Sequence, residues 1–137
     1  MEGRILAIGD VVGKSGLEYL SRKLRSVKKL TGADFVAVNG ENASGVGITP
    51  RQAEQILDAG ADAVTLGNHA FQKKEIFPLL DDEPRLLRPA NFAPQAPGFG
   101  WRVLEASFGP VKLEGVLFTV DTNTGRCLEV KPVNLEE

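Results

Sequence analysis

Three oxygen-bearing side chains and the only histidine of this chain stand at the starts of loops, each loop following an apolar run. They are Asp10, Glu41, Asn68 and His69. Carboxylate and amide oxygens are hard ligands that suit divalent cations, and a nearby imidazole can donate a proton during phosphate chemistry. The pattern therefore predicts half of a metal site with an imidazole beside it.

Each of these residues also has a structural explanation. Asp10 could organise the turn before the first helix, the neighbouring Asn42 could stabilise its own loop, and His69 could be a turn residue. For any one residue alone, the structural explanation is favoured. The metal-site hypothesis depends on the three polar clusters acting together, each with a glycine that permits a tight backbone path.

The elements that would position these residues are three apolar runs, at residues 5–8, 35–38 and 63–66. Helical segments separate them, and this alternation is typical of βαβ units with parallel strands. The carboxyl ends of parallel strands meet at one edge of a sheet, where ligands bind. Three polar clusters from separate loops are therefore expected to converge there.

Helix boundaries can be predicted from local residues. Apolar residues at helical spacing predict a helix over residues 15–30, which Gly32 ends, and its basic residues are expected to form a solvated face. The second helix starts at Thr49 as N-cap, with Gln52 completing a capping box, and it stops at Gly60. Residues 1–69 are thus predicted to be β-α-β-α-β.

The second half of the chain gives weaker patterns. A shorter helix is predicted from Phe71 to Leu80, a fourth strand begins at Leu86, and a further strand covers Trp101 to Ala106. Two β-rich runs, at 111–120 and 126–133, predict an antiparallel hairpin. The predicted fold is a three-layer or partial four-layer α/β sandwich, with a β-α-β-α-β parallel core and a C-terminal β-hairpin.

Size and composition limit the alternatives. The 137 residues, 42% hydrophobic and 25% charged, fit a single domain over residues 1–137. A net charge of −2 does not favour nonspecific DNA binding. The single cysteine, Cys127, and the absence of a signal sequence at the start predict a cytoplasmic protein. No apolar stretch approaches the roughly 18 residues that a membrane-spanning helix needs.

Five sequence blocks together resemble a known family, and they cover the chain from its first strand to its fourth. They are Ile8-Gly9-Asp10-Val11-Val12-Gly13, Asn39-Gly40-Glu41-Asn42-Ala43, Gly47-Ile48-Thr49-Pro50, Thr65-Leu66-Gly67-Asn68-His69 and Leu87-Arg88-Pro89-Ala90-Asn91. The chain resembles the calcineurin-like metallophosphoesterase superfamily, and more narrowly the YmdB-type bacterial cyclic-nucleotide phosphodiesterases.

The resemblance implies a role for each site residue. Asp10 would bind one metal ion, Glu41 both ions and Asn68 the second, and His69 would contact or protonate the phosphate. Asn42 is a further candidate for binding substrate, as is Asn91. The implied cofactors are divalent ions, Mn or Fe, and the implied substrate is a small phosphodiester or cyclic nucleotide.

One segment of the family pattern has no counterpart here. The family's central segment supplies three further metal-binding histidines, whereas this sequence passes from Ala106 almost directly to Gly109, which predicts an internal deletion near residues 106–110. Without these ligands metal binding is expected to be weak or partial. The alternative is a catalytically silent oligomeric scaffold or a phosphate- or nucleotide-binding module.

Two further predictions follow from the first strands and the loop between them. The segment from Gly9 to Ser15 resembles a phosphate-binding P-loop, but it has one residue too few between its glycines. The strands at 5–8 and 35–38 are apolar on both faces, so both faces of the sheet need covering. Either the C-terminal hairpin or a second subunit would do this, and we expect a homo-oligomer.

Overall fold

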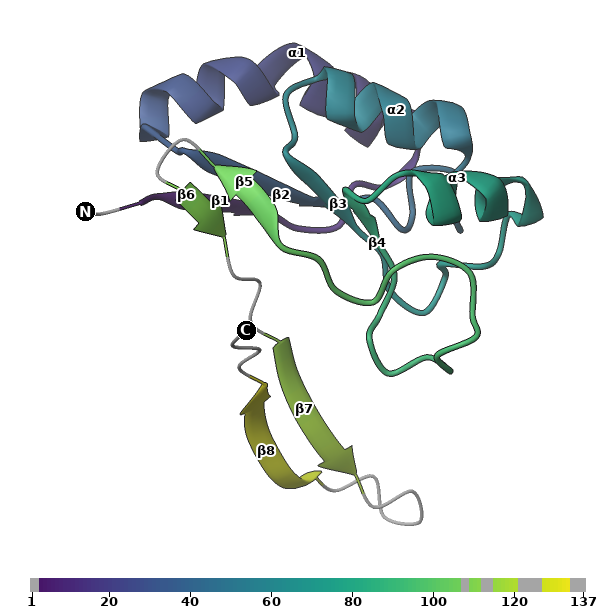
Figure 1. Cartoon of the computed structure of the whole chain (residues 1–137). Coiled ribbons are helices and arrows are strands. Elements are labelled where there is room, and N and C mark those ends of the chain that lie inside the picture. Colours follow the sequence, from purple (N-terminus) through teal and green to yellow (C-terminus); the bar gives the residue numbers. More distant parts are fainter. Residues whose placement is uncertain (1–2, 107–108, 112–114, 121–126, 134–137) are drawn as a thin grey trace.

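A computed structural model describes residues 3–106, 109–111, 115–120 and 127–133. Its centre is a parallel sheet of four strands in the order β1-β2-β3-β4 (Figure 1). The strands are β1 (Ile5–Ile8), β2 (Phe35–Asn39), β3 (Ala63–Thr65) and β4 (Leu86–Leu87). The predicted β-α-β-α-β core is confirmed, and β4 extends it as a further parallel strand.

Two helices, α1 (Gly13–Thr31) and α2 (Pro50–Asp58), cover one face of this sheet (Figure 1). Helix α1 ends at Gly32, whose φ of 64° is in the left-handed region where glycine is favoured. Leu30, by contrast, is 86% exposed.

The capping box of α2 forms as predicted, and it also holds the loop that follows β2. Gln52 N donates to Thr49 Oγ1 at 3.3 Å, and Thr49 N donates to Gln52 Oε1 at 3.0 Å. Gln52 Nε2 then donates to the carbonyl oxygen of Ala43 at 3.1 Å. Since Ala43 follows Glu41 and Asn42 directly, the start of α2 anchors the loop that carries these two residues.

The third helical segment begins later than predicted. A 3₁₀ turn, η1 (Lys74–Ile76), leads into α3 (Phe77–Asp82). Pro78 lies in the first turn of α3, where backbone N–H groups have no acceptor within the helix, so its missing N–H costs no hydrogen bond. The prediction of a helix starting at Phe71 is therefore wrong. Strand β5 (Leu104–Ala106) is likewise shorter than the predicted run from Trp101.

Strand β5 supplies the cover for part of the second face of the sheet. It pairs antiparallel with β6 (Gly109–Val111). Leu104 and Ala106 of β5 pack against Phe35 and Ala63, which are 1% and 0% exposed. Helices, parallel sheet and β5-β6 therefore form three layers, as predicted. Ile5 of the edge strand β1 is still 55% exposed.

The predicted C-terminal hairpin is present. Strands β7 (Gly115–Val120) and β8 (Cys127–Val133) pair antiparallel, while the turn predicted between them lies outside the described residues. The hairpin lies away from the four-stranded sheet (Figure 1). The prediction that it could cover the second face of that sheet is therefore wrong, because β5 lies there instead.

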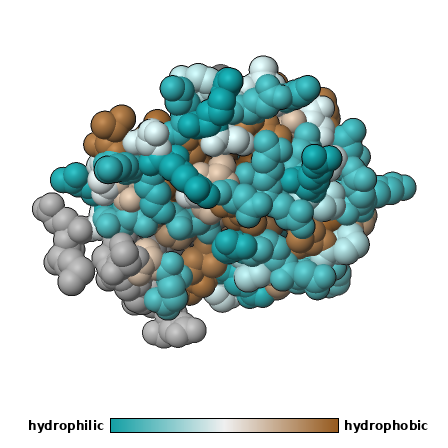
Figure 2. Space-filling view, turned by 90° about the horizontal axis from the view of Figure 1, so that it is seen from above, coloured by the Kyte–Doolittle hydropathy of each residue, from teal (hydrophilic) through white to brown (hydrophobic). Residues whose placement is uncertain are grey.

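The helix side of the molecule presents a mostly hydrophilic surface with separate hydrophobic patches (Figure 2). Arg22, Lys23 and Arg25 of α1 are exposed, and Lys28 forms an ion pair with Asp62 at 2.7 Å. The basic residues of α1 therefore lie in solvent or tie the helix to the sheet, as expected. Among the described residues, no helix is both long and apolar enough to cross a membrane.

The capping box gives a first testable prediction. We expect Thr49→Ala to lower the free energy of unfolding by about 1 kcal/mol, because one helix N–H loses its acceptor. Arg51→Ala, an exposed residue of the same helical turn, is the matched control and should change stability little. Urea unfolding followed by circular dichroism measures both, and equal midpoints for the two variants would contradict the role of the cap.

Candidate functional site

Asn42 joins two of the predicted site residues through its side-chain amide. Its Nδ2 donates to both carboxylate oxygens of Asp10, at 3.1 and 3.0 Å. Its Oδ1 lies 2.7 Å from His69 Nδ1. Because a carboxylate only accepts hydrogen bonds, Nδ2 must face Asp10, and Oδ1 is the atom left for the imidazole. His69 therefore carries a proton on Nδ1, and Nε2 is the nitrogen left for a ligand.

Glu41 contacts the same histidine through its carboxylate. The backbone N–H of His69 donates to Glu41 Oε2 at 3.2 Å, and Nδ1 lies 3.9 Å from the same oxygen. A Cβ on Gly67 would overlap the Glu41 carboxylate, so only glycine allows this close approach. The carboxylate of the loop after β2 is thus packed directly against the loop after β3.

Backbone hydrogen bonds join the loops after β1 and β2 at the carboxyl edge of the sheet. Val11 N donates to Asn39 O at 3.0 Å, and Gly13 N donates to Asn42 O at 2.9 Å. Glu41 N donates to the side-chain Oδ1 of Asn39 at 3.3 Å. This role of Asn39 was missed in the sequence, although an asparagine two residues before the carboxylate is typical of an Asx turn.

The same hydrogen bonds argue against a P-loop. The amides of Val11 and Gly13 already donate to carbonyl oxygens of the loop after β2, so they cannot encircle a phosphate. The Lys14 side chain is 89% exposed, and its Nζ lies 3.7 Å from Glu18 on the same helix. The resemblance of residues 9–15 to a P-loop is therefore confined to the sequence.

The two remaining site candidates lie at the same edge but outside the hydrogen-bonded cluster. Asn68 directly precedes His69 and its side chain is exposed, as is that of Asn91 in the loop after β4. Neither side chain has a hydrogen bond to another residue that the structure describes. The structure therefore joins Asp10, Glu41, Asn42 and His69 directly, and it places the two asparagines beside them by chain order and topology.

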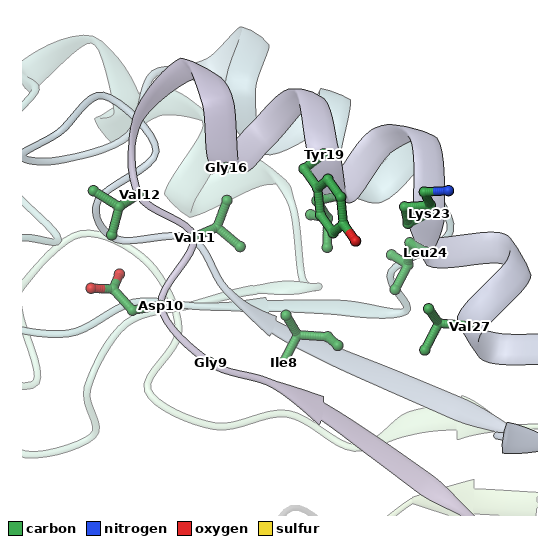
Figure 3. A pocket seen from close by; sticks show the side chains of 11 residues that line it. Ile8, Gly9, Asp10, Val11, Val12, Gly16, Tyr19, Lys23, Leu24 and Val27 are labelled. Carbon is green, nitrogen blue, oxygen red and sulfur yellow. The ribbon is translucent and has the colours of Figure 1, made fainter.

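A groove of about 240 Å³ runs from this cluster along the edge of the sheet, between β1 and α1. Asp10 lies at one end of it, Leu24 and Val27 line the other, and Tyr19 lies between them (Figure 3). The lining is largely apolar, whereas ions and phosphates need charged or hydrogen-bonding partners. The groove is therefore an apolar neighbour of the polar cluster.

The oxygen donors at the carboxyl edge are of the kind that a divalent cation binds. Two carboxylates and an amide oxygen come from three strand ends, and Asp10 keeps lone pairs beyond those that accept from Asn42. Within the described residues, no group of three or more His, Cys, Asp and Glu side chains is placed to hold a metal ion. Metal binding by Asp10, Glu41 and Asn68 therefore stays a prediction, in which water would complete the coordination shell.

The fold is thus an α/β sandwich with carboxylate, amide and imidazole groups at the carboxyl edge of its parallel sheet. The YmdB-like protein family matches residues 6–110, and the chain belongs to this family. The predicted resemblance is confirmed, and a metallophosphoesterase-like family implies divalent metal ions.

Several known proteins are similar to this chain in sequence or in fold. A Bacillus subtilis (strain 168) protein named 2',3'-cyclic-nucleotide 2'-phosphodiesterase is 41% identical over 119 residues, which cover 84% of this chain and 45% of that protein. A hypothetical protein from Thermus thermophilus, of known crystal structure, has a TM-score of 0.69 and 39% identity, over 76% of this chain and 40% of that one.

A Mycoplasma pneumoniae crystal structure, described as a novel phosphatase, has a TM-score of 0.68 and 32% identity. The match covers 77% of this chain and 40% of that one. The present chain thus spans less than half the length of each of these relatives.

The orientation of Asn42 predicts the tautomer of the single histidine. We expect ¹⁵N NMR of neutral His69 to show the proton on Nδ1, because Asn42 Oδ1 can only accept. In Asn42→Ala this hydrogen bond is lost, and the Nε2–H form that predominates in free imidazole side chains should appear. Val46→Ala, an exposed residue of the same loop, should leave the spectrum unchanged. An Nε2–H tautomer in the unaltered chain would contradict the assignment.

Proposed function

We propose that this chain is a metal-dependent phosphodiesterase-type protein that acts on small phosphodiesters such as cyclic nucleotides. The observation that carries the proposal is the hydrogen-bonded series Asp10–Asn42–His69–Glu41 at the carboxyl edge of the sheet. The name of the Bacillus subtilis relative supports the cyclic-nucleotide part. Because this chain spans less than half of each relative, the activity of the whole protein is part of the proposal.

In the proposed site, Asp10, Glu41 and Asn68 hold a divalent metal ion, Mn or Fe. Such an ion would supply positive charge that neutralises phosphate oxygens and activates water for attack on phosphorus. The chain's own residues orient the substrate: the Asn42 amide fixes the imidazole, and Asn91 contacts the phosphate. As the P–O bond to the leaving group breaks, the protonated His69 donates the proton on Nε2 to the leaving oxygen.

The alternative is a catalytically silent scaffold that binds a phosphate or nucleotide. It is favoured by one observation: the described residues include no full set of metal-binding side chains. The family's three central histidines, which we predict to be missing here, would complete such a set. Metal-dependent hydrolysis separates the two proposals.

We expect slow, Mn-dependent hydrolysis of bis(p-nitrophenyl) phosphate that EDTA removes. His69→Ala should lower kcat by roughly 10²-fold or more, as expected for loss of a general acid. Asp10→Ala should abolish the dependence on Mn. Glu54→Ala, an exposed carboxylate on α2, is the control and should act like the unaltered chain. Equal rates for all four proteins would remove the enzymatic proposal.

We further propose that two or more copies associate through the flank formed by β1 and α1. Strand β1 is an edge strand of the described sheet, and such strands offer unpaired N–H and C=O groups. Its flank carries exposed apolar residues: Ile5 is 55%, Val12 53% and Tyr19 61% exposed. The apolar groove between β1 and α1 continues this surface (Figure 3). Burial of this flank would remove apolar area from water.

Light scattering tests the association directly. The unaltered chain should show a mass above that of one copy, increasing with concentration, and Ile5→Lys should reduce it because a charge would be buried at the edge strand. Val46→Lys is the matched control, since Val46 is 50% exposed and lies elsewhere. A single-copy mass at all concentrations would contradict the proposal.

A further inference from the structure

Arg88 is a buried arginine that lies just after β4. Only 7% of it is exposed, and it is the sole charged residue among the buried ones that the structure describes. No carboxylate of the described residues pairs with it. Arg85, three residues earlier, differs: its guanidinium lies 2.7 Å from Glu83, and this hydrogen bond lowers the pKa of the Glu83 carboxyl. Since burying an unpaired charge is costly, Arg88 must be compensated in another way.

Backbone carbonyls supply that compensation, and they all come from the loop that follows. Nε donates to Pro97 O at 3.1 Å, and Nη1 donates to Pro89 O at 3.0 Å. Nη2 makes longer contacts of 3.5 Å with the carbonyls of Ala93 and Ala96. The planar guanidinium has five N–H groups in a fixed fork, so it can join several carbonyls that a lysine could not. The loop is thus built around the guanidinium.

The two ends of this loop are also fastened to each other. Arg88 N donates to Phe99 O at 2.9 Å, next to a parallel bridge between Leu87 and Phe99. A Cβ on Gly100 would lie 2.9 Å from the Ala90 Cα, so the chain passes too close there for any side chain. Residues 88–99, which we name the 88–99 loop, therefore have the closed ends and packed interior of an Ω-loop. Loops of this kind are frequently functional.

The 88–99 loop also contacts the segment that carries His69. The ring centroid of Phe92 lies 5.0 Å from that of Phe71, two residues after His69. Because β4 pairs parallel with β3, the loop after β4 leaves the same edge of the sheet as the loop after β3. The green loop after β4 indeed lies toward this edge in Figure 1. Asn91, exposed, is part of it.

We propose that Arg88 is a positioning residue for substrate binding. It shapes the 88–99 loop into one wall of the phosphate site and thereby holds Asn91 where its amide meets a phosphate oxygen. The inference rests on the proposed function, because that function places a phosphodiester at the carboxyl edge. The inference states that the buried guanidinium of Arg88, which does not touch the substrate, sets the affinity for phosphate by shaping the 88–99 loop.

The experiment compares Arg88→Met and Arg88→Lys with Asn91→Ala and with the double variant Arg88→Met/Asn91→Ala. Arg85→Met is the matched control, because it removes an arginine near the same strand that serves only an ion pair with Glu83. Hydrogen exchange of residues 88–99 reports on the loop, and exchange of α1 reports on the rest of the fold. The KM and kcat for bis(p-nitrophenyl) phosphate with Mn report on the site.

We expect Arg88→Met to accelerate exchange in the 88–99 loop and leave α1 unchanged. It should raise KM about 10-fold, as Asn91→Ala should, in line with loss of one hydrogen bond to a charged group. The double variant should be no worse than either single variant, because both act through the same amide. Arg88→Lys should fall between, and Arg85→Met should match the unaltered chain.

Three results would overturn the inference: unchanged loop exchange, faster loop exchange at an unchanged KM, or additive losses in the double variant. If the unaltered chain hydrolyses nothing, the proposed function fails by itself, and calorimetric binding of inorganic phosphate with Mn replaces KM. Weaker phosphate binding in both Arg88→Met and Asn91→Ala would then support the role of Arg88. Absence of phosphate binding by the unaltered chain would overturn both proposals.

Discussion

The amide of Asn42 is the interaction on which the rest of the edge cluster depends. One side chain donates to a carboxylate from the first loop and accepts from an imidazole of the third, so its orientation is forced by its partners. That single orientation sets which histidine nitrogen carries the proton and which is left for a ligand. Acid, amide and imidazole therefore act as one unit, although they come from distant parts of the chain.

The fold supports this unit with rigid elements rather than with free loops. The capping box of α2 binds the backbone of the Asn42 loop, and glycine at position 67 lets the Glu41 carboxylate approach the next strand end. Strand β5 buries part of the second face of the sheet, against Phe35 and Ala63. The loop after β4 is also ordered, since a buried guanidinium binds its carbonyls. The loops after β2 and β4 are thus each held by hydrogen bonds from a side chain to their backbone carbonyls.

Much of this arrangement could be predicted, for identifiable reasons. The strands at 5–8 and 35–38, the cap at Thr49 and the stop at Gly32 follow from local patterns, and all of them are confirmed. The helix expected from Phe71 was wrong because Pro78 requires a place in a first turn. Leu30 fits the apolar spacing of α1 yet is exposed, so spacing alone does not decide which residues are buried.

The sequence by itself determined that polar residues would gather at one edge, because parallel strands bring their carboxyl ends together whatever the packing details. It also determined the family, through blocks of residues in a fixed order. Only the tertiary structure decided that Asn42 bridges Asp10 and His69, and that Arg88 lies buried among carbonyls. Hydrogen bonds between residues far apart in the chain require side-chain distances and directions, and these are fixed only when the helices and sheets have packed.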